Sequence, residues 1–488
     1  MLLTWKRASS SRQTTPVFST FSLWQKRWIL FLAAFASMFS PMSSFIFYPA
    51  ITSIANDLRV SVDLINLAVT TYMIVSGVVP ALIGNAADNF GRRPVYLLVL
   101  SIYFVANLGL SLQNTYAGLL VLRMLQSAGS SGTISLGYGV IADITTTSER
   151  GFYVGILLLG PNVAPPVGPV LGGVLAARLG WKWIFWFLCI LGGACLALIL
   201  FTLPETCRVI VGNGSEPARG IYQPLLSTIM HSRKPPTATE LPARQQGRFA
   251  DTPIFPNPIA CLKILLVKDL AIILFSNGIY YAIYCCIQAS LSTLFIDVYE
   301  FETIEAGLIY IPFGIACLLS TLTWGRFMDV AYKSTAAHHG LPAGIAREES
   351  VYTFPIRAAR LKGAISLVVI SGAATVGYGW SIHHQVHIAV PLVLQALVGF
   401  GSTALFVALG TLLTDLNAGR SSTAAASANL VRCALAAPAL AAVQPMIDGI
   451  GVGWCFTLFG ALAAMCAPLL CESDAPEVES HADREHGQ

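Results

Sequence analysis

Charged residues are scarce in this sequence. They make up 11% of the 488 residues, whereas hydrophobic residues make up 55%. Soluble globular proteins carry about 25% charged residues. Because so few charges cannot cover a surface that faces water, the composition excludes an ordinary soluble protein and favours one that lies in a membrane.

The spacings of metal-binding and catalytic residues are absent as well. The 11 cysteines are mostly scattered through apolar runs, without a CxxC pair or a cysteine–histidine pattern, so we expect no metal site and no disulfide framework. No nucleophile–base pattern is visible, and we expect neither an enzyme nor a bound cofactor. The net charge of +4 is small, and no nucleic-acid partner is expected.

Long apolar runs dominate what is present. A helix that crosses a bilayer needs about 20 mostly apolar residues. The runs that meet this requirement cover residues 28–50, 62–83, 95–112, 115–142, 152–177, 181–202, 268–293, 303–328, 361–382, 386–412, 422–445 and 449–471. We therefore predict an all-α membrane protein with twelve transmembrane helices.

The positions of the positive charges predict the orientation. Cytoplasmic loops of membrane proteins are enriched in lysine and arginine. With the N-terminus inside, the outer segments hold only Arg59, Arg178 and Lys182 of the 29 lysines and arginines. Both termini are therefore predicted to be cytoplasmic. The plasma membrane is the expected location, and a vacuolar membrane would have the same topology.

The order of the runs predicts two bundles joined by a linker. Residues 203–267 are rich in proline, threonine and arginine and show no apolar periodicity, so we interpret them as a mobile linker. The expected parts are a cytoplasmic tail, a six-helix bundle, the linker, a second six-helix bundle and another cytoplasmic tail, at residues 1–27, 28–202, 203–267, 268–471 and 472–488.

A short internal repeat relates the two halves. Gly84 and Asp88 recur as Gly325 and Asp329, and both pairs are 241 residues apart. Each pair follows, or ends, the second run of its half. Many secondary transporters consist of two repeated halves with the binding site between them, and we predict the same plan here.

The stretch GNAADNFGRRP carries the most specific motif. The sequence here resembles the major facilitator superfamily, whose signature between helices 2 and 3 matches Gly84, Asp88, Gly91, Arg92, Arg93 and Pro94. Gly325 and Asp329 match the partial copy between helices 8 and 9. The resemblance implies the major facilitator fold and a conformational role for these residues, with Asp88 at the N-terminus of helix 11 when the inner side is closed. We also expect Gly84 to end helix 2 and Pro94 to start helix 3.

A narrower resemblance is to the fungal twelve-span drug:proton antiporters of the quinidine-resistance type, a group that includes polyamine and organic-acid exporters. It rests on LPETCRVIVGNGS after helix 6, IYIPFGIA in helix 8, FPIRAARLKG before helix 9 and SSTAAASANLVRCALAA in helix 11. That group is expected to carry an acid where this chain has Arg357.

The fifth run carries GPNVAPPVGPVLGG, which resembles the antiporter signature of this branch. Proline bends a helix, and a Gly-x-x-x-Gly pattern lets a neighbouring backbone approach closely. Pro161, Pro165 and Pro169 are four residues apart and lie roughly on one face. The resemblance implies that this helix closes the cavity against leakage. The candidate residues are Gly160, Pro161, Gly168, Pro169, Gly172 and Gly173.

Two arginines fall inside apolar runs. Arg123 should face the bundle interior or water, because a cation facing lipid is costly, and Gln126 lies one turn away on the same face. The stretch LRMLQSAG resembles the family's Arg-x-x-Gln-Gly pattern, in which the arginine is linked to proton coupling. Arg432, which follows Asn429 by one turn, is expected to be similarly buried, in either a structural or a binding role.

Polar and aromatic side chains mark a candidate substrate face. Tyrosine rings and amides suit an apolar, weakly polar substrate in a central cavity. The seventh run carries such residues at helical spacing, and the first, fourth and eleventh runs add others, although such a stripe can also be packing. The candidates are Ser44, Tyr48, Gln126, Asn277, Tyr281, Tyr284, Gln288 and Arg432.

A carboxylate in the middle of a run is missing. Asp143, Asp269 and Asp415 all lie near inner ends. Proton coupling is therefore implied by the resemblance and not by the residues. The proton carrier stays open between Asp143, Asp269 and a carboxylate on the substrate.

Taken together, the residues and the resemblance predict a monomeric secondary transporter that works by alternating access. It is expected to export a small organic compound, such as a drug, toxin or secondary metabolite, in exchange for protons. One alternative is an exporter of polyamines or of citrate- or itaconate-like organic acids, whose carboxylates would pair with Arg123 and Arg432. Another is a membrane sensor or scaffold that does not transport.

Overall fold

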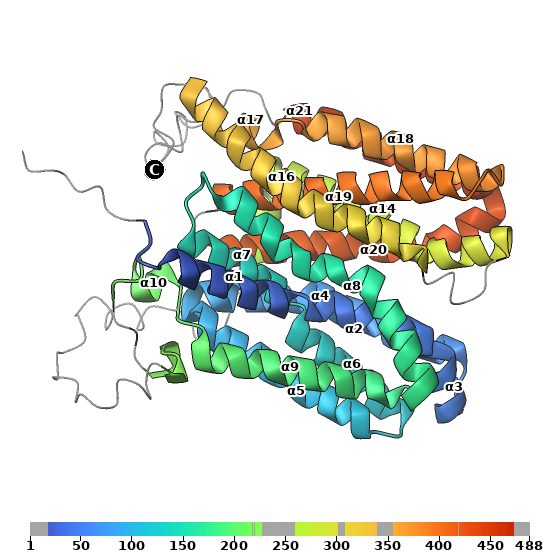
Figure 1. Ribbon diagram of the computed structural model, residues 1–488, viewed down its shortest axis with the longest axis horizontal. Helices are drawn as coiled ribbons and strands as arrows, with labels where there is room; N and C mark the ends of the chain where they lie inside the picture. Colours follow the sequence, from blue (N-terminus) through green and yellow to red (C-terminus); the bar gives the residue numbers. More distant parts are fainter. Residues whose placement is uncertain are drawn as a thin grey trace, which may run out of the picture.

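The computed structural model describes residues 18–216, 218, 220–226, 259–300, 308–338, 355–417 and 419–472. Within these ranges the chain forms helices and turns and contains no β-strand. The long helices run roughly parallel, and α1 begins at the same end of the bundle at which α21 ends (left in Figure 1). We call this end the terminal face and the other end the opposite face.

Helices from the first half of the chain pack together in one bundle, coloured blue to green in Figure 1. Its first pass is broken into three short segments, and its fourth pass is interrupted at Ser131 and Gly132. The segments are α1 (Leu23–Ser37), α2 (Phe39–Phe45), η1 (Tyr48–Ala50), α3 (Ile51–Leu58), α4 (Val62–Phe90), α5 (Arg92–Leu112), α6 (Tyr116–Ser130), α7 (Thr133–Ile144), α8 (Arg150–Leu179) and α9 (Lys182–Thr202).

Helices from the second half form the other bundle, coloured yellow to red. The two bundles meet where α4 packs on α20 and where α8 packs on α16. The segments are α14 (Lys268–Tyr299), α16 (Tyr310–His338), α17 (Ile356–Leu361), α18 (Ala364–His383), α19 (Ala389–Leu416), α20 (Ser421–Ile450) and α21 (Val452–Glu472).

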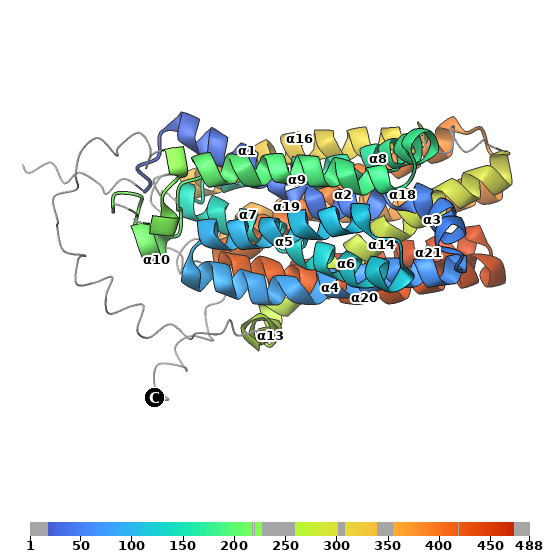
Figure 2. The same cartoon turned by 90° about the horizontal axis from the view of Figure 1, so that it is seen from below.

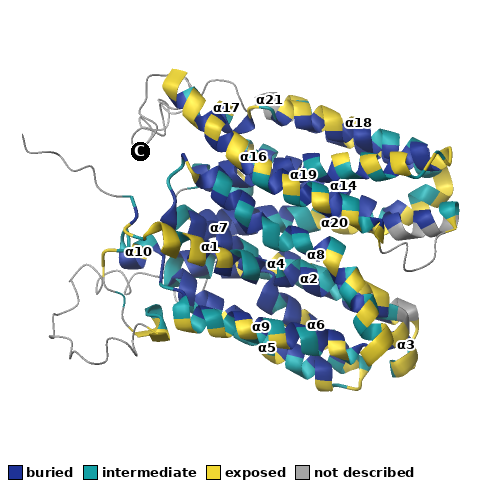
Figure 3. Cartoon of the chain, in the orientation of Figure 1, coloured by how far each residue is buried: buried dark blue, intermediate teal, exposed yellow. Residues whose placement is uncertain are grey.

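The described helices agree with twelve membrane passes. Ten segments are long and apolar enough to cross a bilayer. The other two passes are the interrupted α6–α7 pair and α21, whose apolar stretch Val452–Pro468 is shorter. Outer helix faces expose large apolar side chains (yellow in Figure 3), such as Val105, Ile190 and Val369, which are 57%, 65% and 60% exposed. Such a surface suits hydrocarbon and not water.

The second pass does not end at Gly84, as the sequence suggested. Helix α4 continues to Phe90, and Gly91, with φ of 98°, separates it from α5. Gly84 is needed instead for close packing, because a Cβ there would lie 2.7 Å from the carbonyl oxygen of Ser422 in α20. Pro94 lies in the first turn of α5, where proline is tolerated.

The structure describes parts of residues 203–267, the stretch predicted to be a mobile linker. Short segments form there: α10 (Arg208–Val211), η2 (Gly220–Tyr222) and α13 (Ile259–Leu265), the last of which lies along the side of the helices in Figure 2. Cys261 of α13 is buried, with its sulfur 3.5 Å from the carbonyl oxygens of Ala81 and Thr423. Segments this short show no apolar periodicity. Residues 227–258, like most of the two predicted tails, lie outside the described residues.

Candidate functional site

A cavity of about 1020 Å³ lies between the two bundles. Residues of α2, α4 and α8 line it from one side, and residues of α14, α19 and α20 line it from the other. Along α8 and α20 the lining begins at Leu158 and Asn429 and extends toward the opposite face, as far as Arg178 and Leu440. The cavity therefore opens toward the opposite face, and residues 150–157 of α8 and 421–428 of α20 lie between it and the terminal face.

Most predicted substrate residues line this cavity. The residues that do so are Ser44, Tyr48, Tyr281, Tyr284, Gln288 and Arg432. The rings of Tyr281 and Tyr284 are stacked with centroids 6.2 Å apart, and Phe406 of α19 lies 6.1 Å from each. Together these three rings form an aromatic wall. No feature of the sequence indicated that Phe406 belongs to it.

Two predicted substrate residues were placed wrongly. Gln126 is fully buried within the first bundle, where its amide donates to Asn107 and accepts from Arg123, each at 2.7 Å. Asn277 is 5% exposed and does not line the cavity. Helical spacing predicts which residues share a helix face. It does not predict how the helix is rotated about its axis, and therefore whether that face points to the cavity or to a neighbouring helix.

Arg123 is completely buried behind the cavity wall. Its guanidinium lies between the rings of Phe47 and Tyr72, 4.2 and 4.4 Å from their centroids. It donates hydrogen bonds to the carbonyl oxygen of Ser43 at 3.0 Å and to Gln126. The prediction that it faces the bundle interior is confirmed, but among the described residues it has no carboxylate partner.

Arg432 lies at the cavity surface and is half-buried, which makes it more exposed than expected. Its Nη2 donates to Oδ1 of Asn429 at 3.2 Å, and its guanidinium lies 5.2 Å from the Tyr281 ring centroid. Asn429 in turn donates to the carbonyl oxygen of Ser76 in α4 at 2.7 Å. Asn429 thus orients Arg432 from the same helix and ties this pair to α4 across the bundle interface.

On α8, Pro161, Pro165 and Pro169 occupy a different face from Gly160, Gly168 and Gly172. Pro161, Pro165 and Pro169 line the cavity. The glycines contact the first pass: a Cβ at Gly160 would lie 2.0 Å from the carbonyl oxygen of Ala34, and one at Gly168 would lie 3.0 Å from Cβ of Phe45. The expected close backbone approach is therefore present.

Replacing Gly172 by alanine should destabilise this contact. Its new Cβ would lie 2.1 Å from the backbone oxygen of Ile46, which must move, and overpacking of this kind costs about 1–3 kcal/mol. We expect the purified protein to unfold at a lower temperature, measured by a thermal shift in detergent. The adjacent Gly173→Ala variant is the control, since its Cβ would lie 3.8 Å from Pro49. Equal unfolding temperatures for the two variants would contradict this packing.

The first charge cluster, Asp88, Arg92 and Asp143, lies at the terminal face. Arg92 donates to Asp88 at 2.5 Å, to Asp143 at 2.9 Å and to the hydroxyl of Ser422 in the other bundle at 2.8 Å. Asp88 accepts from the backbone N–H and the hydroxyl of Thr423 at 2.9 and 2.6 Å. The predicted position of Asp88 at the N-terminus of α20 is confirmed. Its negative charge stabilises this helix end, because helix N-termini carry a partial positive charge.

Glu205 supports this cluster and was not recognised from the sequence. Its carboxylate accepts from the backbone N–H groups of Arg92 and Arg93 at 2.9 and 3.2 Å, at the start of α5. The side chain of Arg93 donates to the carbonyl oxygens of Leu200 and Leu203 at the end of α9. Nearby, burial raises the pKa of the Cys207 thiol to about 12, so this thiol stays neutral beside the carboxylates.

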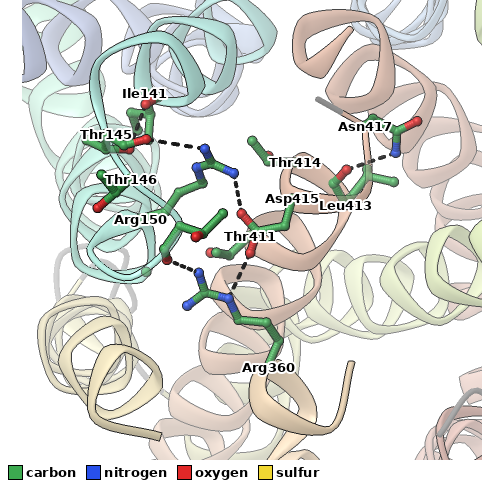
Figure 4. Close-up of polar contacts among 12 residues, drawn as sticks. Ile141, Thr145, Thr146, Arg150, Arg360, Thr411, Leu413, Thr414, Asp415 and Asn417 are labelled. Atoms are coloured by element: carbon green, nitrogen blue, oxygen red, sulfur yellow. Dashed lines mark hydrogen bonds and ion pairs between the residues drawn. The ribbon is translucent and has the colours of Figure 1, made fainter. Parts of the chain in front are cut away.

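The second charge cluster, Arg150, Asp329, Arg360 and Asp415, also joins the bundles, and Figure 4 shows Arg150, Arg360 and Asp415. Asp415 accepts from Arg150 of the first bundle and, at 2.8 Å, from Nε of Arg360. Arg360 also donates to the carbonyl oxygen of Thr147. Asp329 accepts from the N–H groups of Gly151 and Phe152 at the start of α8, both at 3.0 Å.

The two clusters repeat one geometry. Arg92 at the start of α5 binds Asp143 through Nε, as Arg360 in α17 binds Asp415. Asp88 contacts the first turn of α20, as Asp329 contacts the first turn of α8. The repeat predicted from two residue pairs therefore extends to Arg360 and Asp415, which sequence comparison at a fixed spacing missed because the second half is longer between its second and third passes.

The unexpected Arg357 also has a partner. It donates to Asp269 at 3.0 Å, and the two side chains are 16% and 37% exposed. Both residues belong to the second bundle, so this pair does not join the bundles.

Comparison with known proteins gives one consistent result. The sequence model of the Major Facilitator Superfamily matches residues 33–439. The MFS-type transporter phiD of Fungal sp. (strain ATCC 74256) is 38% identical, over 93% of this chain and 68% of that protein. Citrate exporter 1 of Aspergillus niger is 36% identical, over 94% of this chain and 87% of that protein. The solved structure of the proton:xylose symporter XylE is similar in fold, with a TM-score of 0.66 at 16% identity, over 93% and 96% of the two chains.

Proposed function

The chain belongs to the major facilitator superfamily, and from this premise we propose that it exports small organic compounds by alternating access and leaves them chemically unchanged. The observation that carries the proposal is the central cavity, which residues of both bundles line. Polar contacts join the bundles between this cavity and the terminal face. Because such contacts can break and re-form, the bundles can rock and expose the cavity at either face. The names of phiD and citrate exporter 1 support the transport of small organic molecules.

The terminal face is proposed to be cytoplasmic, because lysine and arginine concentrate in the segments at that face. The described conformation is then the outward-facing one, from which an exported compound leaves. We place the protein in the plasma membrane, with a vacuolar membrane as the alternative, and expect it to act as a monomer.

Export is further proposed to be coupled to inward movement of protons. No aspartate or glutamate is among the described residues that line the cavity, so we place the proton carrier outside it, at Asp143. This carboxylate is 8% exposed and bound to Arg92. When the terminal face opens, Ser422 leaves Arg92 and water can reach Asp143.

A flux measurement tests the coupling. In proteoliposomes with an acidic interior, inside-out protein should accumulate substrate, and one pH unit should support about tenfold accumulation of a neutral substrate exchanged for one proton. Adding the proton–potassium exchanger nigericin should abolish the accumulation. Flux that is unchanged when the pH gradient collapses would contradict proton antiport, and the absence of any flux would favour the sensor alternative.

A further inference from the structure

We infer that the central cavity takes a substrate with one acid group on an apolar body, and that Arg432 binds the acid. This inference rests on the proposed export function, because it assumes that the central cavity holds the transported compound. It narrows the substrate from small organic compounds in general to amphipathic organic acids.

The first argument is the charge of the lining. Among the described lining residues, the only charged side chains are Arg178 and Arg432. A cationic substrate would lose part of its hydration in the cavity without gaining an acidic side chain as an ion-pair partner. An anionic substrate could instead bind a guanidinium group. This difference in charge favours the anion.

The second argument is that Arg432 has donors left over. Its hydrogen bond to Asn429 uses one N–H, and Nε has no hydrogen-bond partner among the described residues. No carboxylate of the described residues pairs with it. Guanidinium groups present several N–H donors in a planar fork that fits a carboxylate, and a cation in the middle of a membrane protein generally serves such a function.

The other two arginines are less suitable. Arg123 is fully buried behind the wall formed by Tyr72 and does not line the cavity. Arg178 is exposed near the opposite face, where water screens its charge. The acid group is therefore placed at Arg432, toward the terminal-face end of the cavity.

The rest of the lining indicates an apolar body. The aromatic wall of Tyr281, Tyr284 and Phe406 lies beside Arg432, and Met73 and Leu158 contribute further apolar surface. The amide of Gln288 lines the same side, is 3% exposed, and neither of its polar atoms finds a hydrogen-bond partner in the described residues. It can bind a hydroxyl or carbonyl group on the body. A tricarboxylate would instead place its remaining charges against the aromatic rings.

Three probes that share one apolar body test the inference. They are 2-naphthaleneacetic acid, its neutral amide 2-naphthaleneacetamide, and the cation 2-(2-naphthyl)ethylamine. Binding to the full chain in nanodiscs is measured by equilibrium dialysis at neutral pH, with empty nanodiscs subtracted. We expect the acid to bind at least about tenfold more tightly than the amide or the amine, as a charge-assisted contact should give.

Variants assign the preference to Arg432. Arg432→Gln should bind acid and amide about equally, while its unchanged affinity for the amide shows that the cavity is intact; Arg432→Lys should keep part of the preference. The matched control, Arg178→Gln, should keep the full preference. Equal binding of the acid and amide by the wild-type protein, including no binding of either, overturns the inference, as does an Arg432→Gln variant that still prefers the acid.

Two further measurements separate the parts of the proposal. If citrate displaces the naphthalene acid more effectively than the unlabelled acid does, the apolar body is refuted. Flux in proteoliposomes distinguishes this inference from the proposed function. Binding that depends on Arg432 without any flux refutes export but keeps the acid site, whereas flux of the amide and amine without preference for the acid keeps export and refutes the acid site.

Discussion

Replacing Asp415 by asparagine should shift the protein away from the state closed at the terminal face and reduce transport at least about tenfold. The Asp415 carboxylate binds two buried guanidinium groups: the Asp415 and Arg360 side chains are 0% exposed, and that of Arg150 is 7% exposed. Breaking a buried ion pair by removing one partner costs about 3–5 kcal/mol.

The free-energy penalty of Asp415→Asn should be larger in the state closed at the terminal face than in the state open there. Arg150 belongs to the first bundle, and Asp415 and Arg360 belong to the second. When the terminal face opens, water can solvate the separated arginines, so the substitution penalises mainly the closed state. A penalty of 3–5 kcal/mol corresponds to a change of roughly 100- to 4000-fold in the ratio of the two states.

Distances between spin labels can measure this shift. Glu149 and Ser334 are exposed near the terminal face on different bundles, and labels there should move apart in Asp415→Asn. The control is Asp269→Asn, which removes the same charge from the partly exposed pair with Arg357, where an ion pair contributes about 1 kcal/mol or less. Unchanged label distances in Asp415→Asn would contradict the assignment. Normal proton-coupled flux in Asp269→Asn would also exclude Asp269 as the proton carrier.

Replacing Asp88 by asparagine should have the second largest effect. Asp88 is 6% exposed, and it binds both Arg92 and the first turn of α20. Asparagine can still accept one hydrogen bond, but it loses the charge that favours the helix N-terminus and the guanidinium. Hydrogen bonds to charged groups contribute about 1.5–3 kcal/mol, so we expect the closed state to lose roughly 10- to 100-fold in population.

The loss of the closed state in Asp88→Asn should appear as a longer distance where the first charge cluster contacts the start of α20. Labels at Val209 and Arg420, both exposed at the terminal face, report the distance between the first charge cluster and the start of α20. The control is Asn89→Ala, which removes a neighbouring half-buried side chain whose amide bonds only within α4. The proposed role of Asp88 is rejected if its variant and the control give the same distances.

The sequence alone was sufficient for the membrane passes, and the resemblance to the major facilitator superfamily supplied the contact of Asp88 with helix 11. Lipid solvates only apolar surface, so each membrane pass can be recognised in the sequence as one continuous run of apolar residues. The motif around Asp88 was recognisable because turn residues and charges stand between two such runs. The Gly168-x-x-x-Gly172 pattern likewise predicted a close approach of a neighbouring backbone, because small residues at this spacing leave room for one.

Other features depended on which helices become neighbours. Gln126 and Asn277 have the spacing of cavity residues, yet the rotation of their helices places them away from the cavity. Glu205, which binds the start of α5, and α10 lie in segments too short to show periodicity. The second charge cluster brings together Arg150, Arg360 and Asp415 from positions far apart in the chain. Their charges are visible in the sequence, but their pairing is not, because Coulomb attraction depends on distances that only the packed bundles set.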